Sequence, residues 1–381
     1  MYKATRSSRK SKKLAIGIWR KNSRQMKILS IIGARPQFIK ASPVSREIAK
    51  HTDIEEIIVH TGQHFDPNMS KIFFDQMKIP EPDYNLGINS LSHGAMTGRM
   101  LEEIEKVMIV EKPDWVIVYG DTNSTLAGSL AAKKMHLKVA HVEAGLRSFN
   151  MNMPEEINRV LTDRISDILF CPTQTAVDNL KTEGYEKLGC EIIFSGDVML
   201  DAALLYSQKA KKPSEDISSQ YILTTIHREE NTTNEERLKS IYNALKIISK
   251  EIQVIIPIHP RTRKQLDELH STSRENNIKL INPLGYLEML YLLRNCSLVI
   301  TDSGGLQKEA YFFEKPCVTI RDETEWTELV KIGSNIVAGT NVHSIIDSYN
   351  HMKDSKITFS YKLFGSGNAA QIVVNEILAY K

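Results

Sequence analysis

The order of the apolar segments limits the possible folds of this chain more than any other feature of its sequence. From Met26 onward, short apolar runs rich in β-branched residues alternate with longer amphipathic stretches such as 96–111 and 123–134. Most runs are continuously apolar, which is typical of strands buried on both faces of a parallel sheet that helices cover. The repeating unit is therefore a strand followed by a helix. The predicted strands form two series: 27–33, 54–60, 114–120, 138–144, 167–172 and 191–196, then 221–227, 252–259, 278–283, 297–305 and 316–320.

A largely polar segment, 201–220, separates the two series and is typical of a linker or a variable surface segment. We therefore predict an α/β protein with two Rossmann-like domains in tandem, 26–200 and 201–368. The last stretch, 369–381, is predicted as a C-terminal helix that could pack on either domain. Ligands of such sheets bind beyond the carboxyl ends of the strands, so the polar residues at those ends are the candidates for function.

Charge is distributed unevenly between the first 25 residues and the rest. The chain holds 49 Lys and Arg against 46 Asp and Glu, but nine of the cations lie in residues 1–25. The body that remains is acidic, which argues against a nucleic-acid partner, because such proteins concentrate positive charge on the folded domain. Residues 1–25 form a basic tail that is disordered, precedes a true start at Met26, or tethers the protein to an anionic surface.

Two further classes of protein are excluded by composition. The tail has no apolar core of about 7–15 residues, so it is not a secretory signal. No stretch approaches about 18 uncharged apolar residues, so we predict no membrane span. The four cysteines are far apart, which predicts reduced thiols in a cytoplasmic protein and neither a disulfide framework nor a zinc site: Cys171, Cys190, Cys296 and Cys317.

The first strand ends in a turn suited to an anion. Gly33 is followed by Arg35, a helix-opening Pro36, and Lys40. The free N–H groups of a helix start and the two cations favour a phosphate, although a helix-capping turn with surface cations fits the same residues. The pattern is neither a Walker loop nor a dinucleotide fingerprint.

Carboxylates follow the next strands. Asp121 and Glu143 end neighbouring predicted strands, and two carboxylates brought close together can act as an acid or a base near neutral pH. The alternatives are that Asp121 caps the following helix and that Glu143 pairs with Arg147 at i+4. Glu155 follows a Pro at a helix start, which is also ordinary helix chemistry.

The second series of predicted strands also has candidate functional residues at its ends. His227 directly follows a strand, where a packed or capping histidine is the common alternative to a catalytic one. Ser303, Gly304 and Gly305 lie between a strand and a helix, where small residues let backbone N–H groups approach a diphosphate. Glu309, one turn into that helix, could reach a ribose diol.

Together these segments resemble the non-hydrolysing UDP-N-acetylglucosamine 2-epimerase family. The similarity runs in order through GARPQFIKASPV, TGQH, VYGDTNSTLAG, HVEAGLRS, PEEINR, TTIHREEN, IHPRTR and ITDSGGLQKEA. It implies a GT-B architecture in which two Rossmann-like domains, the second binding UDP, close over a UDP-sugar in an interdomain cleft, usually in a homodimer. It also implies an isomerase that needs no cofactor or metal and converts UDP-N-acetylglucosamine to UDP-N-acetylmannosamine, through a 2-acetamidoglucal, for surface polysaccharide synthesis.

The resemblance also assigns residues. Matched positions make four residues catalytic acids or bases: Asp121, Glu143, Glu155 and His227. Matched positions and strand-end chemistry assign eight to substrate binding: Arg35, Lys40, Arg147, Ser303, Gly304, Gly305, Glu309 and Arg321. In some bacterial members a second substrate molecule activates the enzyme, and the stretch 61–64 with His259 fits that region, although Asp66 replaces a common Gln.

Several positions depart from the common family pattern. The opening motif has Gln37 where Glu is common, Glu229 replaces a cation, and Trp326 and Thr327 replace an Arg and a Pro. These variants resemble the branch that acts on UDP-2,3-diacetamido-2,3-dideoxy-glucuronate, which is the alternative substrate. Less favoured alternatives are a GT-B glycosyltransferase, a hydrolysing epimerase and a non-catalytic UDP-sugar sensor. The carboxylates at the strand ends favour proton transfer over glycosyl transfer. A hydrolysing epimerase would differ only in its products, and the titratable side chain at every proposed acid/base position argues against a sensor.

Overall fold

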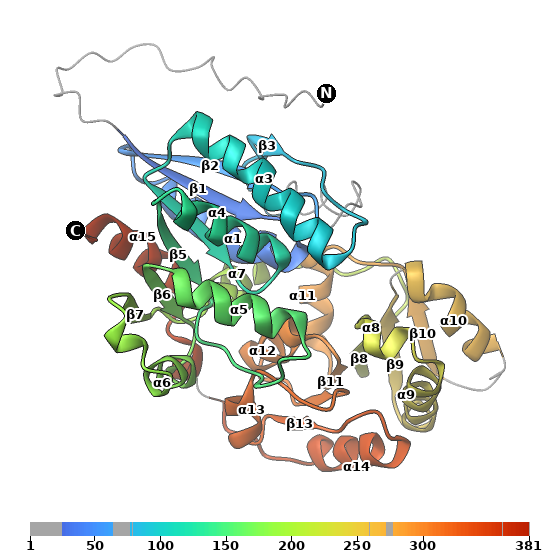
Figure 1. Cartoon of the computed structure of the whole chain (residues 1–381). Helices are drawn as coiled ribbons and strands as arrows, with labels where there is room; N and C mark the ends of the chain where they lie inside the picture. Colours follow the sequence, from blue (N-terminus) through green and yellow to red (C-terminus); the bar gives the residue numbers. More distant parts are fainter. Residues whose placement is uncertain are drawn as a thin grey trace. The chain divides into compact units, whose positions relative to one another are not determined.

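The computed structural model describes residues 25–63, 77, 79–258, 260–271, 277–359 and 361–380 (Figure 1). The basic tail therefore lies outside the described residues, apart from Gln25. The chain divides into two compact units: Met1–Ala202 with Lys362–Lys381, and Ala203–Tyr361. Each unit is an α/β structure around its own parallel sheet, which confirms the predicted fold class.

The first unit holds the strands β1 to β7. Its elements are β1 (Met26–Ile32), α1 (Arg35–Ile48), β2 (Ile54–His60), β3 (Tyr84–Asn85), α3 (His93–Glu111), β4 (Trp115–Tyr119), α4 (Asn123–Lys134), β5 (Lys138–Val142), α5 (Pro154–Ile165), β6 (Ile168–Cys171), α6 (Gln174–Thr182), η1 (Tyr185–Lys187), β7 (Glu191–Phe194), η2 (Tyr361–Phe364) and α15 (Ala369–Ala379). Helix α7 (Val198–Ser207) carries the chain into the second unit.

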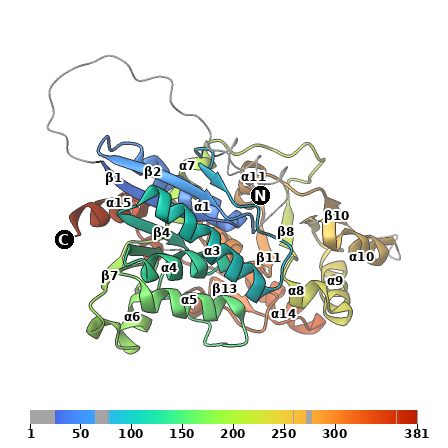
Figure 2. The same cartoon turned by 45° about the horizontal axis from the view of Figure 1, so that its top comes forward.

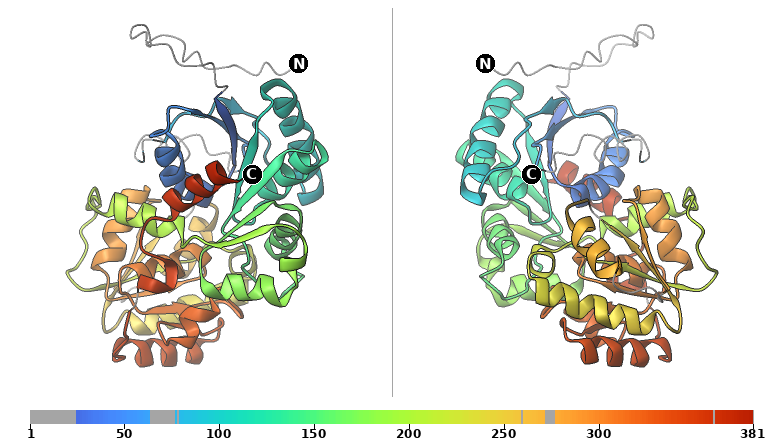
Figure 3. Two further views of the ribbon diagram at one scale, coloured as in Figure 1. Left: turned by 90° about the vertical axis from the view of Figure 1, so that its left-hand side faces the viewer. Right: turned by 90° about the vertical axis from the view of Figure 1, so that its right-hand side faces the viewer.

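The first sheet has the strand order β3-β2-β1-β4-β5-β6-β7, and every pairing is parallel. Its central strands are continuously buried, as in Trp115–Tyr119, because helices cover both faces. Figure 2 shows α3, α4 and α5 side by side along one face, and Figure 3 shows α1 and α15 on the other. The chain order reverses between β1 and β4, which is where such sheets bind ligands.

The C-terminal helix belongs to the first unit, a question that its sequence leaves open. Helix α15 packs against α1, and the ring of Tyr380 meets that of Trp115 edge-on at a centroid distance of 5.0 Å. Asp201 accepts hydrogen bonds from the first N–H groups of α15, those of Ala369 (3.2 Å) and Ala370 (2.8 Å). Burial raises the pKa of Asp201 to about 6.

The second unit holds a six-stranded sheet. Its elements are β8 (Tyr221–Thr225), α8 (Glu229–Thr232), α9 (Glu235–Ile248), β9 (Gln253–Pro257), α10 (Pro260–Ser271), β10 (Ile278–Ile281), α11 (Tyr286–Asn295), β11 (Leu298–Thr301), α12 (Gly304–Phe312), β12 (Cys317–Thr319), α13 (Thr327–Lys331), β13 (Asn335–Val337) and α14 (Val342–Lys353). The order β10-β9-β8-β11-β12-β13 repeats that of the first sheet, again with parallel pairs, and reverses between β8 and β11.

All eleven predicted strands are confirmed, and two short ones, β3 and β13, were not predicted. Two or three residues are too few to show a periodic pattern. The four cysteines are free thiols, and burial raises the pKa of both Cys296 and Cys317 to about 12. Among the described helices, none is both long and apolar enough to cross a membrane.

Candidate active site

The turn after β1 is fixed from the end of β4. Gly33 is required there, because a Cβ at this position would lie 2.1 Å from Oγ1 of Thr61. The Gln37 side chain accepts from the N–H of Gly33 (2.8 Å) and donates to the carbonyl of Tyr119 (2.9 Å). A carboxylate could not make the second bond. The amide that distinguishes this chain from the common family pattern therefore joins the two strand ends at the reversal point.

Lys40 and Glu143, both predicted site residues, form an ion pair. Lys40 lies in the second turn of α1, Glu143 directly follows β5, and their side chains are 9% and 8% exposed. The backbone of Glu143 has a φ of 76°, which turns the chain sharply away from the strand. The alternative pairing of Glu143 with Arg147 does not occur, because this segment is not helical and the i+4 rule does not apply.

Asp121 lies at the end of β4 and contacts Arg159 of α5. It does not cap α4, because Thr122 does so through its side chain, which accepts from the N–H of Thr125. Burial alone would raise the pKa of Asp121, but the positive charges of Arg159 and Lys40 outweigh it and lower that pKa. Asp121 is thus held as a carboxylate.

Arg147 is predicted to bind substrate, and in the structure two carboxylates hold it. Its guanidinium is buried and donates to Asp163 (2.7 Å) and Glu183 (2.7 Å), neighbours within its own unit. Both carboxylates raise its pKa further, against the effect of burial. These contacts show Arg147 holding the segment after β5, and its binding of substrate stays a prediction.

His141 lies in β5, next to the strand ends that carry Asp121 and Glu143. Its ring is fully buried, with Nδ1 2.7 Å from Oδ1 of Asp163 and Nε2 2.7 Å from the carbonyl oxygen of Gly120. Both partners are hydrogen-bond acceptors, so each ring nitrogen faces an acceptor oxygen. Asp163 also accepts from the N–H of Gly145 (3.2 Å). The contacts of His141 and Asp163 therefore hold the chain at Gly120, just before Asp121, and at Gly145, just after Glu143.

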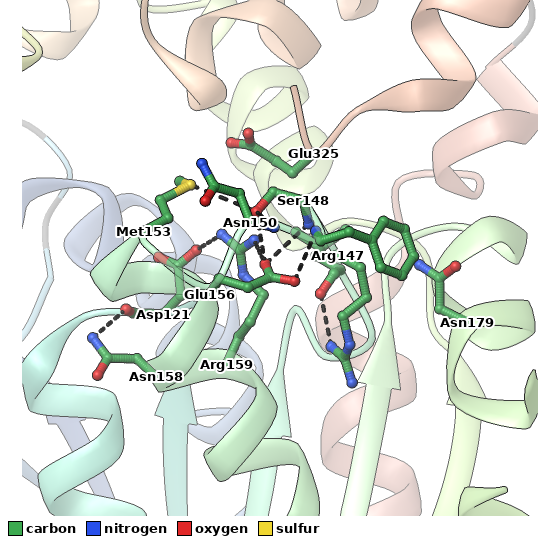
Figure 4. A network of polar contacts seen from close by, with 12 residues as sticks. Asp121, Arg147, Ser148, Asn150, Met153, Glu156, Asn158, Arg159, Asn179 and Glu325 are labelled. Atoms are coloured by element: carbon green, nitrogen blue, oxygen red, sulfur yellow. Dashed lines mark hydrogen bonds and ion pairs between the residues drawn. The ribbon is translucent and has the colours of Figure 1, made fainter. Parts of the chain in front are cut away.

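The first turn of α5 carries Glu155, which is half-buried, and Glu156, which is 1% exposed. Glu156 accepts from Ser148 and Phe149 of the preceding loop and from Arg159 (Figure 4). Sequence reasoning missed Glu156 and Arg159. Both lie in the PEEINR motif at i and i+3, a spacing that could have indicated their contact.

In the second unit, Asp302 joins the ends of β8 and β11. It is fully buried and accepts from the backbone N–H of His227 (3.0 Å) and of Arg228 (3.0 Å). The His227 side chain is 50% exposed, and its Nδ1 lies 3.3 Å from Oδ1 of Asp302. The catalytic candidate thus presents its ring to solvent while a buried carboxylate orients it.

The predicted diphosphate turn opens α12. Ser303 caps this helix, with its side chain accepting from the N–H of Leu306. Gly304 lies close to Glu325: a Cβ here would lie 2.1 Å from Oε1 of Glu325, so that side chain would have to move. Glu309, further along α12, is 7% exposed and accepts from the hydroxyl of Tyr286 at 2.8 Å.

Arg321 and Trp326 complete this region. Arg321 is 1% exposed and donates to Glu325 at 2.9 Å, so it braces the residue that lies against the turn. Trp326, which stands where the family commonly has Arg, is also 1% exposed, and Nζ of Lys308 lies 4.7 Å from its ring centroid. A buried aromatic ring over a buried lysine therefore replaces the family's cation.

The remaining candidates are placed less fully. Arg35 is half-buried at the start of α1, and Gly305 is half-buried in the first turn of α12. Residues 64, 66 and 259, which the substrate-activation hypothesis needs, lie outside the described residues. Within the described ranges no group of three His, Cys, Asp or Glu side chains could hold a metal ion.

Each of the two parallel sheets thus has polar groups at its reversal point. The sequence matches one known family along most of the chain. The model of that family, described as UDP-N-acetylglucosamine 2-epimerase, matches residues 46–378. The chain belongs to the UDP-N-acetylglucosamine 2-epimerase family. It is accordingly an isomerase of the UDP-sugar 2-epimerase type.

Individual relatives of this epimerase are also named as UDP-sugar 2-epimerases. A Pseudomonas aeruginosa protein named UDP-2,3-diacetamido-2,3-dideoxy-D-glucuronate 2-epimerase is 56% identical over 91% of this chain and 97% of its own. A UDP-N-acetylglucosamine 2-epimerase of Methanococcus maripaludis is 47% identical over 93% and 99%. The Methanocaldococcus jannaschii UDP-GlcNAc 2-epimerase, solved in complex with UDP-GlcNAc and UDP, superimposes with a TM-score of 0.86 at 46% identity, covering 93% of this chain and 100% of that one.

Proposed function

We propose that this epimerase inverts carbon 2 of a UDP-linked 2-acetamido sugar by eliminating UDP and adding it back. The observation that carries the proposal is the set of ionisable side chains at the end of the first sheet. Asp121 and Glu143 follow adjacent strands and each contacts a cation, Arg159 or Lys40. Such a set can accept a proton and stabilise charge in one place.

The proposed reaction has two steps. A carboxylate takes the proton from C2 while the C1–O bond breaks and its electron pair leaves with UDP, which gives a 2-acetamidoglucal. The diphosphate oxygen then attacks C1, and C2 takes a proton on its opposite face. C2–H is weakly acidic, so the first step needs a positioned base and a stabilised leaving group.

Most of the predicted residues then have a role. We assign proton transfer to Asp121, Glu143, Glu155 and His227. The cations Arg35 and Lys40 stabilise the departing diphosphate, and the start of α12 binds the nucleotide through the backbone N–H groups of Gly304 and Gly305. Glu309 accepts from the ribose hydroxyls, and Arg321 supports this site through Glu325.

Substitution of either central carboxylate tests these roles. Asp121→Asn and Glu143→Gln each remove a proton acceptor while keeping the shape of the side chain. We expect turnover to fall by about 10²–10⁴-fold while UDP affinity, measured by calorimetry, stays within a factor of three. Near-normal turnover in either variant would remove that residue from the mechanism.

We infer that the preferred substrate is UDP-2,3-diacetamido-2,3-dideoxy-glucuronate. Two observations support this over UDP-N-acetylglucosamine: the 56% identity to the relative named for that sugar, and the replacement of the family's Arg by Trp326. UDP-N-acetylglucosamine remains the second candidate because relatives named for it are 47% and 46% identical.

A direct comparison of kcat/KM for the two sugars, with epimers separated chromatographically, distinguishes these substrates. A higher value for UDP-N-acetylglucosamine would reverse the order. We also propose a cytoplasmic homodimer, as the resemblance implies. Light scattering of the purified chain, whose mass is 43.2 kDa, should then give twice that mass.

A further inference from the structure

Arg159 joins a proposed catalytic carboxylate to a buried one. Its side chain is 2% exposed and lies on α5. One guanidinium nitrogen, Nη2, donates to Oδ2 of Asp121, and the other, Nη1, donates to Oε2 of Glu156 at 2.5 Å (Figure 4). A planar guanidinium that is held by two carboxylates has little freedom to rotate. Asp121 is therefore oriented from the side of α5.

Glu156 in turn holds the loop between β5 and α5. Its Oε2 accepts from the N–H (2.9 Å) and the hydroxyl (3.0 Å) of Ser148, and its Oε1 accepts from the N–H of Phe149 (3.0 Å). Phe149 has a φ of 57°, a conformation that a non-glycine residue seldom adopts, and its side chain is 75% exposed. The loop keeps this conformation because a buried carboxylate binds its backbone. It leads from Glu143 to Glu155.

The backbone of Asp121 is fixed from the same helix. Asn158, next to Arg159, donates to the carbonyl oxygen of Asp121 at 2.9 Å. The charged groups that act on the Asp121 carboxylate are Arg159 from α5, Lys40 from α1 and Glu143 after β5. Arg159 is the one that also contacts the loop-holding Glu156, so it is placed to couple the orientation of Asp121 to that of the loop.

We propose that Arg159 is a positioning residue of the epimerase. It keeps Asp121 ionised and aimed, so that Asp121 accepts the C2 proton in the first step, and through Glu156 it ties this carboxylate to the loop that leads to Glu155. The inference rests on the proposed function for its catalytic part. Its electrostatic part concerns Asp121 alone and can be measured without substrate.

Kinetics of Arg159→Gln test the catalytic part. We expect kcat to fall by about 10²-fold, the usual cost of misplacing a reacting group by about 1 Å, with KM and UDP affinity within a factor of three. Arg159→Lys should recover part of the loss, because it keeps the charge without the planar fork. Arg164→Gln, an exposed position on the same helix, is the matched control and should behave as wild type.

The pH profile separates a positioning role from a merely structural one. Loss of the Arg159 charge should move the acidic limb of kcat/KM to higher pH, because Asp121 then protonates more easily. The double variant Arg159→Gln/Glu156→Gln removes the charge of the buried carboxylate that the single change leaves without the Arg159 cation. It keeps the test valid if Arg159→Gln alone does not fold, and it should show the same shift.

Carbon-13 NMR of the Asp121 carboxyl group, assigned with Asp121→Asn, gives a readout that needs no turnover. Asp121 should titrate at higher pH in the Arg159 variants than in wild type. Wild-type protein that is inert towards both sugars would refute the proposed function, while a titration shift would still support the electrostatic role of Arg159. An unchanged titration, or unchanged kcat in a folded Arg159→Gln variant, would overturn the inference.

Discussion

Replacing His141 by Phe tests whether a buried ion pair of His141 with Asp163 holds the strand ends that carry Asp121 and Glu143. The ring makes two hydrogen bonds of 2.7 Å, to Asp163 and to the carbonyl of Gly120, and none of its surface is exposed. Removing one partner of a buried ion pair costs about 3–5 kcal/mol. Asp163 keeps Arg147 as a second cation, so we expect the lower end, about 3 kcal/mol.

For a unit of this size, 1 kcal/mol corresponds to about 2–4 °C in Tm, so the variant should unfold about 6–12 °C below wild type. Scanning calorimetry measures this, with His136→Gln as a control at an exposed histidine of the same unit. Asp163→Asn should destabilise as well, and the double variant should lose less than the sum of the two, because both changes break one pair.

A loss below about 2 °C in the His141→Phe variant would refute the ion-pair reasoning, since it would be too small for a buried pair. Nitrogen-15 NMR of the wild-type ring gives an independent check. Two protonated ring nitrogens are expected, and a single N–H would show that the ring is neutral and that His141 and Asp163 do not form an ion pair.

Three other changes have defined outcomes. Asp201→Asn should flatten the pH dependence of the free energy of unfolding between about pH 4 and 6. The pKa of Asp201 is raised from 3.8 to about 6 in the folded state, so the folded state binds the proton more tightly. The free energy of unfolding of the wild type therefore falls by about 3 kcal/mol as pH rises through that window. Urea titrations at several pH values would show an equal slope in both proteins if this is wrong. Lys40→Met leaves Glu143 without its cation and should lower kcat by about 10²-fold or more in steady-state assays, and unimpaired turnover would argue against a role for the pair. Gly304→Ala should weaken UDP binding about 10-fold or more by displacing Glu325 from the turn, whereas Gly94→Ala, where a Cβ meets open space, should leave calorimetric UDP affinity unchanged.

The sequence predicts the sheets well and the pairing of site residues poorly. Continuous apolar runs locate the strands because burial on both faces demands them, as for 115–119 in β4. The polar residues at the strand ends follow from the same rule. Which of them meet depends on side chains that arrive from distant helices, and no local pattern encodes this.

Glu143 illustrates the difference. Local spacing offers Arg147 as its partner, but the chain leaves β5 with a positive φ at Glu143 and is not helical afterwards. Lys40, more than a hundred positions earlier, takes that place instead. Asp121 likewise loses the capping role to Thr122 and meets Arg159 of α5. Tertiary structure decides these contacts.

Proton NMR in deuterated water tests the central claim most directly. The purified protein is incubated with UDP-2,3-diacetamido-2,3-dideoxy-glucuronate and, separately, with UDP-N-acetylglucosamine. The account predicts that at least the first sugar yields its C2 epimer with deuterium at C2, because the proton leaves to a carboxylate and returns from solvent. An epimer that retains its C2 proton, or the absence of both epimer and exchange with either sugar, would contradict the account.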